Sequence, residues 1–408
     1  MTYLTHLECA ACGERLDPDQ PWQLCPACNN PLLARYDLAL IGREASLDDV
    51  GRRPPGMWRY RELLPLREPE RAVSLGEGAT APLQVPRLAE RMAVPGLLVK
   101  DEGTLPTGTF KARGAAVGVS RAVELGVRTL ALPTAGNAGA AWAAYGARAG
   151  LRVVVVMPET TPSLIRREAA ACGAEVYLVP GSIADAGVVV RDGCRRHGWY
   201  DASTLKEPYR VEGKKTMGFE LADQLGWRLP DVIVYPTGGG VGLIGMRKGF
   251  QELLALGWLP AGSRAPRFVA AQAAGCAPVV RAFAERAEVS VAWEEPVTFA
   301  AGIRVPRPLG DFLILRALRE TGGTAVAVPD ETIAVTMELA GAAEGMVVCP
   351  EGAAALAAAE RLRRDGWIGE EEVVAVFNTG TGLLYEDSLP GRAPRKTGIA
   401  SDGWQLGT

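Results

Sequence analysis

The sequence has almost no excess charge, no long apolar run and no basic amino-terminal stretch. Its 44 Lys and Arg nearly balance 47 Asp and Glu, for a net charge of −3, so neither nucleic acid nor an anionic membrane is an expected partner. The apolar runs, such as residues 153–157, are far too short to span a bilayer. The first residues lack the basic and apolar regions of a secretory signal, so we expect a cytoplasmic protein with reduced thiols.

Because the net charge is small, an anionic substrate must be captured by a local site. The 408 residues are enough for two domains and a small module, and no fixed-period repeat is visible. A hydrophobic fraction of 48% with 48 Gly is typical of a close-packed α/β protein. Short apolar runs alternate with Ala-rich helical stretches, which predicts parallel sheets covered on both faces. The runs that predict strands lie at 129–134, 152–158, 175–180, 231–237, 267–272 and 372–379.

Four cysteines form two C-x-x-C pairs near the amino terminus, Cys9 with Cys12 and Cys25 with Cys28. Two such turns bring four sulfurs together in the tetrahedral thiolate set that a structural zinc ion prefers. The alternative is a ribbon that keeps its thiols and folds without metal. The remaining cysteines stand among small or apolar residues and are interpreted as core residues: Cys172, Cys194, Cys276 and Cys349.

Lys111 is the most informative residue of the chain. It follows a Pro/Gly turn and Phe110, and it precedes the small residues Gly114, Ala115 and Ala116, so it is expected at the mouth of a helix with little room for water. Partial burial disfavours the ammonium form and makes the amine a nucleophile near neutral pH. Such an amine is suited to a Schiff base with a carbonyl cofactor, above all pyridoxal phosphate. The alternative is a surface lysine that caps a loop.

Three further loops follow predicted strands, where ligands bind in parallel sheets. Asn137 lies at the apex of the small-residue turn 133–139, and its amide can bond a phenolic oxygen. The glycines of 238–242 allow backbone amides to approach a phosphate at a helix amino terminus. Thr379, after the last strand, has a hydroxyl that could face a ring nitrogen. Taken singly, Asn137 and Thr379 are also explained by ordinary turn chemistry.

The glycine loop also matches other phosphate-binding patterns. Gly240, Gly242 and Gly245 satisfy G-x-G-x-x-G after a strand, the dinucleotide-binding fingerprint. That fingerprint requires an acidic residue at the end of the next strand to bond a ribose. Here the next predicted strand, 267–272, ends at Gln272 and is not directly followed by an acidic residue. No Lys-Ser/Thr follows the glycines, which excludes a Walker phosphate loop.

Together these loops resemble the pyridoxal-phosphate enzymes of fold type II, the tryptophan synthase β type, and within them the threonine synthases. The resemblance covers nearly the whole chain, through the cysteine pairs, LGEGATAP, PTGTFKARG, TAGNAG, EPYRVEGKKTMGFE, TGGGVG and NTGTGL. It implies an α/β fold of two doubly wound parallel-sheet domains with a zinc-ribbon-like module. The expected ranges are 1–40 for the module, 41–119 with 226–395 for the larger cofactor domain, 120–225 for the smaller domain and 396–408 for a tail.

The resemblance also implies residue roles. Lys111 would be the Schiff-base lysine and proton shuttle, with Phe110 beside the cofactor, Asn137 on its phenolic oxygen and Thr379 at its pyridine nitrogen. Its phosphate would be held by Gly238, Gly239, Gly240, Val241 and Gly242. The substrate would be held by Thr80, Thr134, Ala135, Lys206, Arg210 and Lys214. The implied reaction converts O-phospho-L-homoserine and water to L-threonine and phosphate, in a homodimer.

Two departures keep alternatives open. Ala112 follows the lysine where threonine synthases usually have Asp, as in dehydratases of the fold, and Glu207 stands where asparagines usually help to hold the substrate phosphate. A lyase acting on threonine, serine or a related amino acid is therefore the second hypothesis, and a catalytically idle member is the third. For the basic residues of the 206–215 segment, a solvated face is an equally open interpretation: Lys206, Arg210, Lys214 and Lys215.

Overall fold

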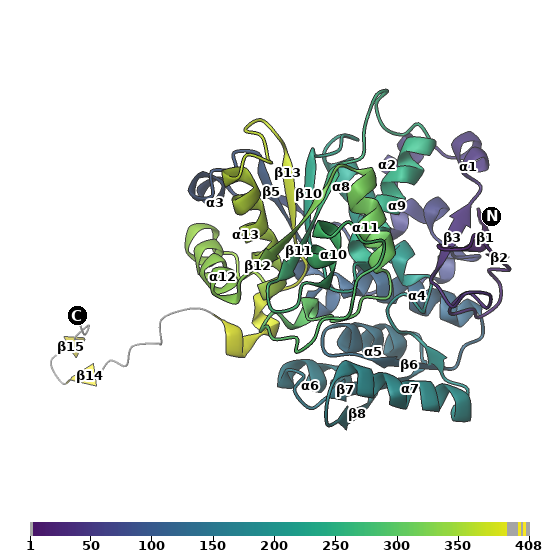
Figure 1. Cartoon of the computed structure of the whole chain (residues 1–408). Coiled ribbons are helices and arrows are strands. Elements are labelled where there is room, and N and C mark those ends of the chain that lie inside the picture. Colours follow the sequence, from purple (N-terminus) through teal and green to yellow (C-terminus); the bar gives the residue numbers. More distant parts are fainter. Residues whose placement is uncertain (1–2, 390–398, 401–402, 405–408) are drawn as a thin grey trace.

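A six-stranded sheet is the centre of the molecule in the computed structural model, which describes residues 3–389, 399–400 and 403–404 (Figure 1). The strands run in the order β12-β11-β10-β13-β5-β4, all parallel except β4, which is antiparallel to β5. Their bounds are β4 Pro82–Gln84, β5 Leu97–Asp101, β10 Val232–Pro236, β11 Arg267–Ala273, β12 Thr324–Val328 and β13 Val374–Asn378.

Successive residues of these strands point to opposite faces of the sheet, and helices cover both faces. Ile233 and Tyr235 belong to the core shared with α8, α9 and α11, whereas Val232 and Val234 pack with α3, α12 and α13. Because helices cover both faces of the sheet, both of these sets of residues are buried, and the strands are continuously apolar instead of alternating between apolar and polar residues. The helices bear these bounds: α3 Pro86–Arg91, α8 Arg210–Gln224, α9 Val241–Ala255, α10 Pro278–Ala284, α11 Asp311–Glu320, α12 Asp330–Glu344 and α13 Pro350–Arg364.

A second sheet of four parallel strands, in the order β8-β7-β6-β9, lies below the first in Figure 1. Its strands and helices are β6 Thr129–Pro133, β7 Arg152–Pro158, β8 Glu175–Val179, β9 Tyr200–Asp201, α4 Lys111–Glu124, α5 Ala138–Arg148, α6 Ser163–Ala171 and α7 Ile183–His197. The edge strand β8 departs from the prediction of sheets covered on both faces, because Tyr177 and Leu178 are 49% and 44% exposed.

The amino-terminal module is a three-stranded antiparallel sheet of β1 Leu4–Cys9, β2 Arg15–Leu16 and β3 Leu32–Tyr36. The connector that follows packs on the main body through α1 Leu38–Glu44, α2 Leu47–Arg52 and the 3-10 turn η1 Met57–Leu63, and Arg59 pairs with Asp223 of α8 at 2.9 Å. The shorter 3-10 turns are η2 Pro69–Arg71, η3 Glu102–Thr104, η4 Pro106–Gly108, η5 Ala301–Ile303, η6 Gly382–Leu384 and η7 Glu386–Ser388.

The parallel α/β architecture predicted from the apolar runs is confirmed, and the four clustered cysteines are compatible with the expected ribbon. The division into residue ranges stays a prediction. The expected tail 396–408 and the end of the larger domain at 390–395 lie outside the described residues, apart from the short strands β14 Ile399–Ala400 and β15 Gly403–Trp404. Among the described residues, no helix is both long enough and apolar enough to cross a membrane.

Candidate functional site

A cavity of about 380 Å³ opens at the carboxyl ends of strands from both sheets. Its walls include the loops that follow β6, β10 and β13, at residues 133–138, 238–242 and 379–380, together with the start of α4. This is where ligands bind in open parallel sheets. The volume suits a small cofactor with a small substrate beside it.

Lys111 is the first residue of α4 and lines this cavity. The loop before it is tied to the turn after β13, because Phe110 N donates to Thr379 O at 3.0 Å and Thr381 N donates to Gly108 O at 2.9 Å. The Lys111 amine lies 4.0 Å from the centre of the Phe110 ring. Burial lowers the pKa of Lys111 to about 8, with Glu351 acting against this shift and Arg210 adding to it. The lowered pKa leaves more of the amine neutral near physiological pH than in an exposed lysine, and the neutral amine is the form that acts as nucleophile or base.

A second amine, that of Lys214 on α8, lies on the same aromatic ring at 4.3 Å from its centre and donates a hydrogen bond to Phe110 O. Gly114 of α4 makes room for it, since a Cβ there would lie 2.8 Å from Lys214 Cε. Burial, with the neighbouring charges of Lys111 and Arg210, holds the pKa of Lys214 well below its usual value. Lys214 and Lys215 are both almost fully buried, so a solvated basic face is wrong for them.

The glycine loop leads directly into the amino terminus of α9. Gly240 precedes the helix with φ of 72°, a left-handed conformation that favours glycine. A Cβ at Gly240 would lie 2.2 Å from Ile314 Cδ1, and one at Gly242 would lie 2.0 Å from Tyr235 Oη. The close packing explains why small residues are needed, and the first amides of α9 with the positive end of its dipole make an anion site.

Asn137 immediately precedes α5 and heads a chain of hydrogen bonds across the cavity wall. Its Nδ2 donates to Tyr385 Oη at 3.0 Å, Tyr385 Oη donates to Glu351 Oε1 at 3.1 Å, and Gly302 N donates to the same carboxylate oxygen at 2.6 Å. Asn137 Oδ1 is buried and has no hydrogen-bond partner among the described residues. A buried polar atom without a partner in a cavity is ready to bond a ligand.

Thr379 follows β13 and lines the same cavity, with its Oγ1 at 3.8 Å from Cys349 Sγ. Cys349 was interpreted from sequence as a core residue, but it also lines the cavity and accepts from Gly352 N at 3.3 Å at the start of α13. Burial raises the pKa of Cys349, which keeps its thiol neutral. Cys349 and Glu351 belong to no motif of the sequence, and Tyr385 lies two residues beyond the NTGTGL motif.

The segment 200–210, called the anion segment below, contributes Ser203, Thr204, Lys206 and Arg210 to the cavity wall. Arg210 Nη1 donates to Thr204 Oγ1 at 2.8 Å, and Lys206 pairs with Asp201 at 2.8 Å. Glu207 does not line the cavity: it accepts from Tyr209 N at 2.8 Å and Arg210 N at 2.7 Å. The Glu207 carboxylate therefore stabilises the start of α8 and does not face a substrate phosphate in the cavity. Burial raises the pKa of Glu207 to about 7.

Charge in the cavity wall is strongly one-sided. Among the described residues that line it, six have basic side chains and one, Glu351, has a carboxylate; the basic residues are Lys111, Lys206, Arg210, Lys214, Arg304 and Arg307. Thr134 and Ala135, also expected at the substrate, lie in the wall as well. Such a wall has a local preference for anions that the net charge of the chain does not reveal.

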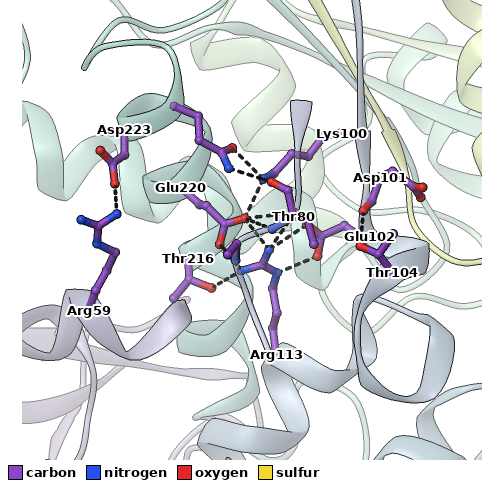
Figure 2. A network of polar contacts seen from close by, with 12 residues as sticks. Arg59, Thr80, Lys100, Asp101, Glu102, Thr104, Arg113, Thr216, Glu220 and Asp223 are labelled. Atoms are coloured by element: carbon purple, nitrogen blue, oxygen red, sulfur yellow. Dashed lines mark hydrogen bonds and ion pairs between the residues drawn. The ribbon is translucent and has the colours of Figure 1, made fainter. Parts of the chain in front are cut away.

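Thr80 is the one expected substrate residue that does not line the cavity. It is 3% exposed and belongs to the buried ionic network of Figure 2, where its hydroxyl donates to Glu102 Oε1 at 2.8 Å. Arg113 of α4 pairs there with Glu102 at 2.6 Å and with Glu220 of α8 at 3.0 Å, and Lys100 of β5 pairs with Glu220 at 2.6 Å. This network holds β5, α4 and α8 together behind the cavity.

The four amino-terminal thiols form a separate cluster. The Sγ atoms of Cys9, Cys12, Cys25 and Cys28 all lie within 4.8 Å of one another, and neighbouring sulfurs are 3.4 Å apart between Cys9 and Cys28 and 3.7 Å apart between Cys12 and Cys25. Four sulfurs at these separations can surround one tetrahedral metal ion.

Comparison with known proteins identifies the class of protein. The family model described as "Pyridoxal-phosphate dependent enzyme" matches residues 73–380, and the chain belongs to this family. Two curated relatives are threonine synthases: that of Methanosarcina acetivorans is 38% identical over 92% of this chain and 91% of its own, and that of Methanocaldococcus jannaschii is 35% identical over 93% of each.

Solved structures support the fold. Maize serine racemase superposes with a TM-score of 0.64 at 21% identity, over 76% of this chain and 91% of its own. A pyridoxal 5'-phosphate-dependent aspartate racemase gives 0.66 at 20% identity, over 85% of this chain and 98% of its own.

The cavity fits pyridoxal phosphate by its own geometry. Lys111 lines it, the buried Asn137 Oδ1 has no partner among the described residues, and the glycine loop lines it directly before the amino terminus of α9. The residues that would hold the cofactor were all expected from sequence and all line the one cavity: Phe110, Lys111, Asn137, Gly238, Gly239, Gly240, Val241, Gly242 and Thr379. Their individual roles stay predictions.

Proposed function

We propose that this enzyme converts O-phospho-L-homoserine and water to L-threonine and phosphate. The observation that carries the proposal is the excess of basic side chains over carboxylates in the cavity wall. The cofactor phosphate is served by the amino terminus of α9, which leaves Lys206 and Arg210 for a further anion. O-phosphohomoserine has two anionic groups for this charge, its γ-phosphate and its α-carboxylate, whereas free serine or threonine has only the carboxylate.

The chain's own residues then have distinct tasks. Lys111, with its pKa lowered to about 8, takes the proton from the substrate Cα and then moves the proton at Cβ, because its amine is tethered within reach of both carbons. Arg210 and Lys206 hold the γ-phosphate until it leaves. Thr379 presents a neutral hydroxyl, not a carboxylate, to the cofactor ring. The bound cofactor supplies an electron sink that stabilises negative charge on the substrate carbons.

Incubation of the purified protein with O-phosphohomoserine tests the proposal. Threonine and inorganic phosphate are expected in equal amounts. Phosphate without threonine, or neither product, contradicts it.

The second candidate is a lyase acting on threonine or serine, which Ala112 beside the lysine favours. The two candidate functions are distinguished by incubating the protein with free threonine or serine and measuring the 2-oxo acid produced. Production of 2-oxo acid from these at rates above those with O-phosphohomoserine would support the lyase.

Three further expectations belong to the same proposal. One structural zinc ion would be bound by Cys9, Cys12, Cys25 and Cys28. The resemblance to threonine synthases supports a homodimer, which light scattering after size-exclusion chromatography measures. A cytoplasmic location agrees with the reduced thiols that the zinc site requires, and fractionation of expressing cells tests it.

A further inference from the structure

The cysteine ribbon, residues 4–36, lies outside the matched family residues 73–380, yet it touches the elements that carry the site. In Figure 1 its purple strands lie beside α4. One part in contact is the loop between the two cysteine pairs, residues 17–23. This ribbon loop begins five residues after Cys12 and ends two before Cys25, so closing the thiols on one metal ion fixes both of its ends.

The ribbon loop bonds directly to the anion segment. Tyr200 Oη donates to Trp22 O at 3.1 Å, Gln23 Nε2 donates to Asp201 O at 3.1 Å, and Tyr209 Oη donates to Pro18 O at 2.7 Å. These bonds flank both ends of the stretch that carries Ser203, Thr204 and Lys206. Buried or half-buried hydrogen bonds of this kind hold backbone position.

The ribbon also reaches the two helices that carry the amines. Arg121 of α4 donates to Pro18 O at 2.8 Å and pairs with Asp19 at 2.5 Å. At the other end of the ribbon, Tyr36 Oη donates to Glu212 of α8 at 2.7 Å, two residues before Lys214. Tyr36 therefore bonds into a buried cluster of Glu212, Lys215 and Lys248, in which Lys215 and Glu212 are 2.6 Å apart.

Within the anion segment, the residues that the ribbon loop contacts are bonded to, or adjacent to, residues that line the cavity. Asp201, whose backbone is held by Gln23, accepts from Ser203 N at 3.0 Å and pairs with Lys206. Arg210, next to Tyr209, holds Thr204. Ser203 and Lys206 are thus each one bond from Asp201, and Arg210 directly follows Tyr209 in the chain. Thr204 is linked to the ribbon loop less directly, through its bond to Arg210.

We infer that the ribbon is a positioning element of the active site: with zinc on its four cysteines, it fixes the anion segment and thereby sets the affinity for the anionic group of the substrate. This inference rests on the proposed function for the identity of that group. It assigns to the ribbon a role in substrate binding and none in holding the cofactor, whose predicted contacts come from the other loops.

The double variant Tyr200→Phe/Tyr209→Phe tests the contacts, because neither residue lines the cavity and only two hydroxyl donors are removed. We expect KM for O-phosphohomoserine and Kd for inorganic phosphate to rise about fivefold, with kcat and the absorbance of the bound cofactor unchanged. The matched control is Tyr177→Phe, which removes a hydroxyl bond to Glu175 at the exposed edge strand β8. A double variant that behaves like this control overturns the inference.

The metal is tested on the intact holoenzyme. Zinc is measured by atomic emission, removed with a chelator and restored, while phosphate Kd by calorimetry and the cofactor absorbance are followed. Loss of phosphate affinity with the cofactor absorbance retained, and recovery on adding zinc, is the expected result. Unchanged affinity after removal, or protein that is purified without zinc and binds phosphate normally, contradicts it. Phosphate binding is read without turnover, so a failure of the proposed reaction stays distinguishable from a failure here.

Discussion

At the scale of single residues, the reactivity of Lys111 depends on the charges that share its wall. Glu351 raises the pKa of Lys111 against the effect of burial. Glu351→Gln keeps the oxygen that accepts from Gly302 N but removes this charge, so the pKa of Lys111 should fall further below about 8. Labelling of Lys111 in cofactor-free protein by an amine reagent, followed against pH by peptide mapping, measures the midpoint.

The control for this titration is Glu288→Gln, because the Glu288 side chain is 94% exposed. It should leave the midpoint where the wild-type protein has it. A midpoint that rises in Glu351→Gln would mean that the carboxylate does not act on the amine.

Removal of the amine itself gives a second prediction. Lys111→Ala should fold, since burial of an ammonium group is unfavourable and its loss costs little, but it should have no turnover and no absorbance band from covalently bound cofactor. Lys206→Ala is the comparison, because Lys206 lines the same cavity and its side chain is 32% exposed. It should keep the band and lose affinity for phosphate. Residual turnover in Lys111→Ala would contradict the assigned role.

The residues that carry motifs could be predicted from sequence, and those that act through packing could not. Lys111, Asn137 and Gly240 stand in turns whose composition is unusual in itself. Cys349 and Glu351 lie at the start of an ordinary helix, and only the folding of α13 against β13 brings Cys349 to Thr379 and both residues into the cavity wall. Thr80 is the opposite case: it belongs to a motif and was expected at the substrate, but it lies in the buried ionic network and does not line the cavity.

At the scale of elements, apolar runs predicted the strands wherever a strand is uniformly buried. They missed the edge strands β4 and β12, which are not uniformly buried, and they missed β5, because Lys100 and Asp101 interrupt its apolar pattern. Lys100 is nevertheless fully buried, and its charge is balanced by Glu220 of α8. That compensation comes from a residue 120 positions away, which no local pattern contains.

The ionic network around Arg113 should therefore be a large contribution to stability. Arg113→Met leaves Glu102 and Glu220 buried with too little positive charge, and we expect a loss of about 3 kcal/mol in the free energy of unfolding, measured with denaturant. Arg152→Met is the matched control: it breaks the exposed pair of Arg152 and Glu175, whose side chains are 50% and 40% exposed, and it should cost much less stability than Arg113→Met. Equal losses would count against a special role for the network.

The loop before α9 offers a comparison between backbone strain and crowding. Gly240 and Gly257 have φ of 72° and 67°, but only Gly240 is crowded, whereas a Cβ at Gly257 meets nothing within 4 Å. Gly257→Ala should cost about 1 kcal/mol through its backbone alone. Gly240→Ala should cost more and also weaken cofactor binding, measured by titration of the cofactor absorbance. Similar effects of the two variants would show that the tight fit at Gly240 is unimportant.

At the scale of the whole molecule, the site is made where two sheets meet. Loops after β6 come from the smaller sheet, and loops after β10 and β13 come from the larger one. The order of these loops along the chain could be predicted, whereas the balance of charge could not, because the net charge of −3 conceals six basic side chains gathered on one wall.

A ligand that contacts loops of both sheets should stabilise both together. Removal of the cofactor is expected to lower the unfolding temperature, and increasing its concentration should raise it, since a ligand at 100 times its Kd adds about 2.7 kcal/mol to the folded state. Calorimetry of the cofactor-free protein at several cofactor concentrations measures this. One transition that moves as a unit would mean that the two sheets unfold together around the cavity. A transition that ignores the cofactor, or two transitions of which only one responds, would mean that the cavity does not tie the sheets to each other.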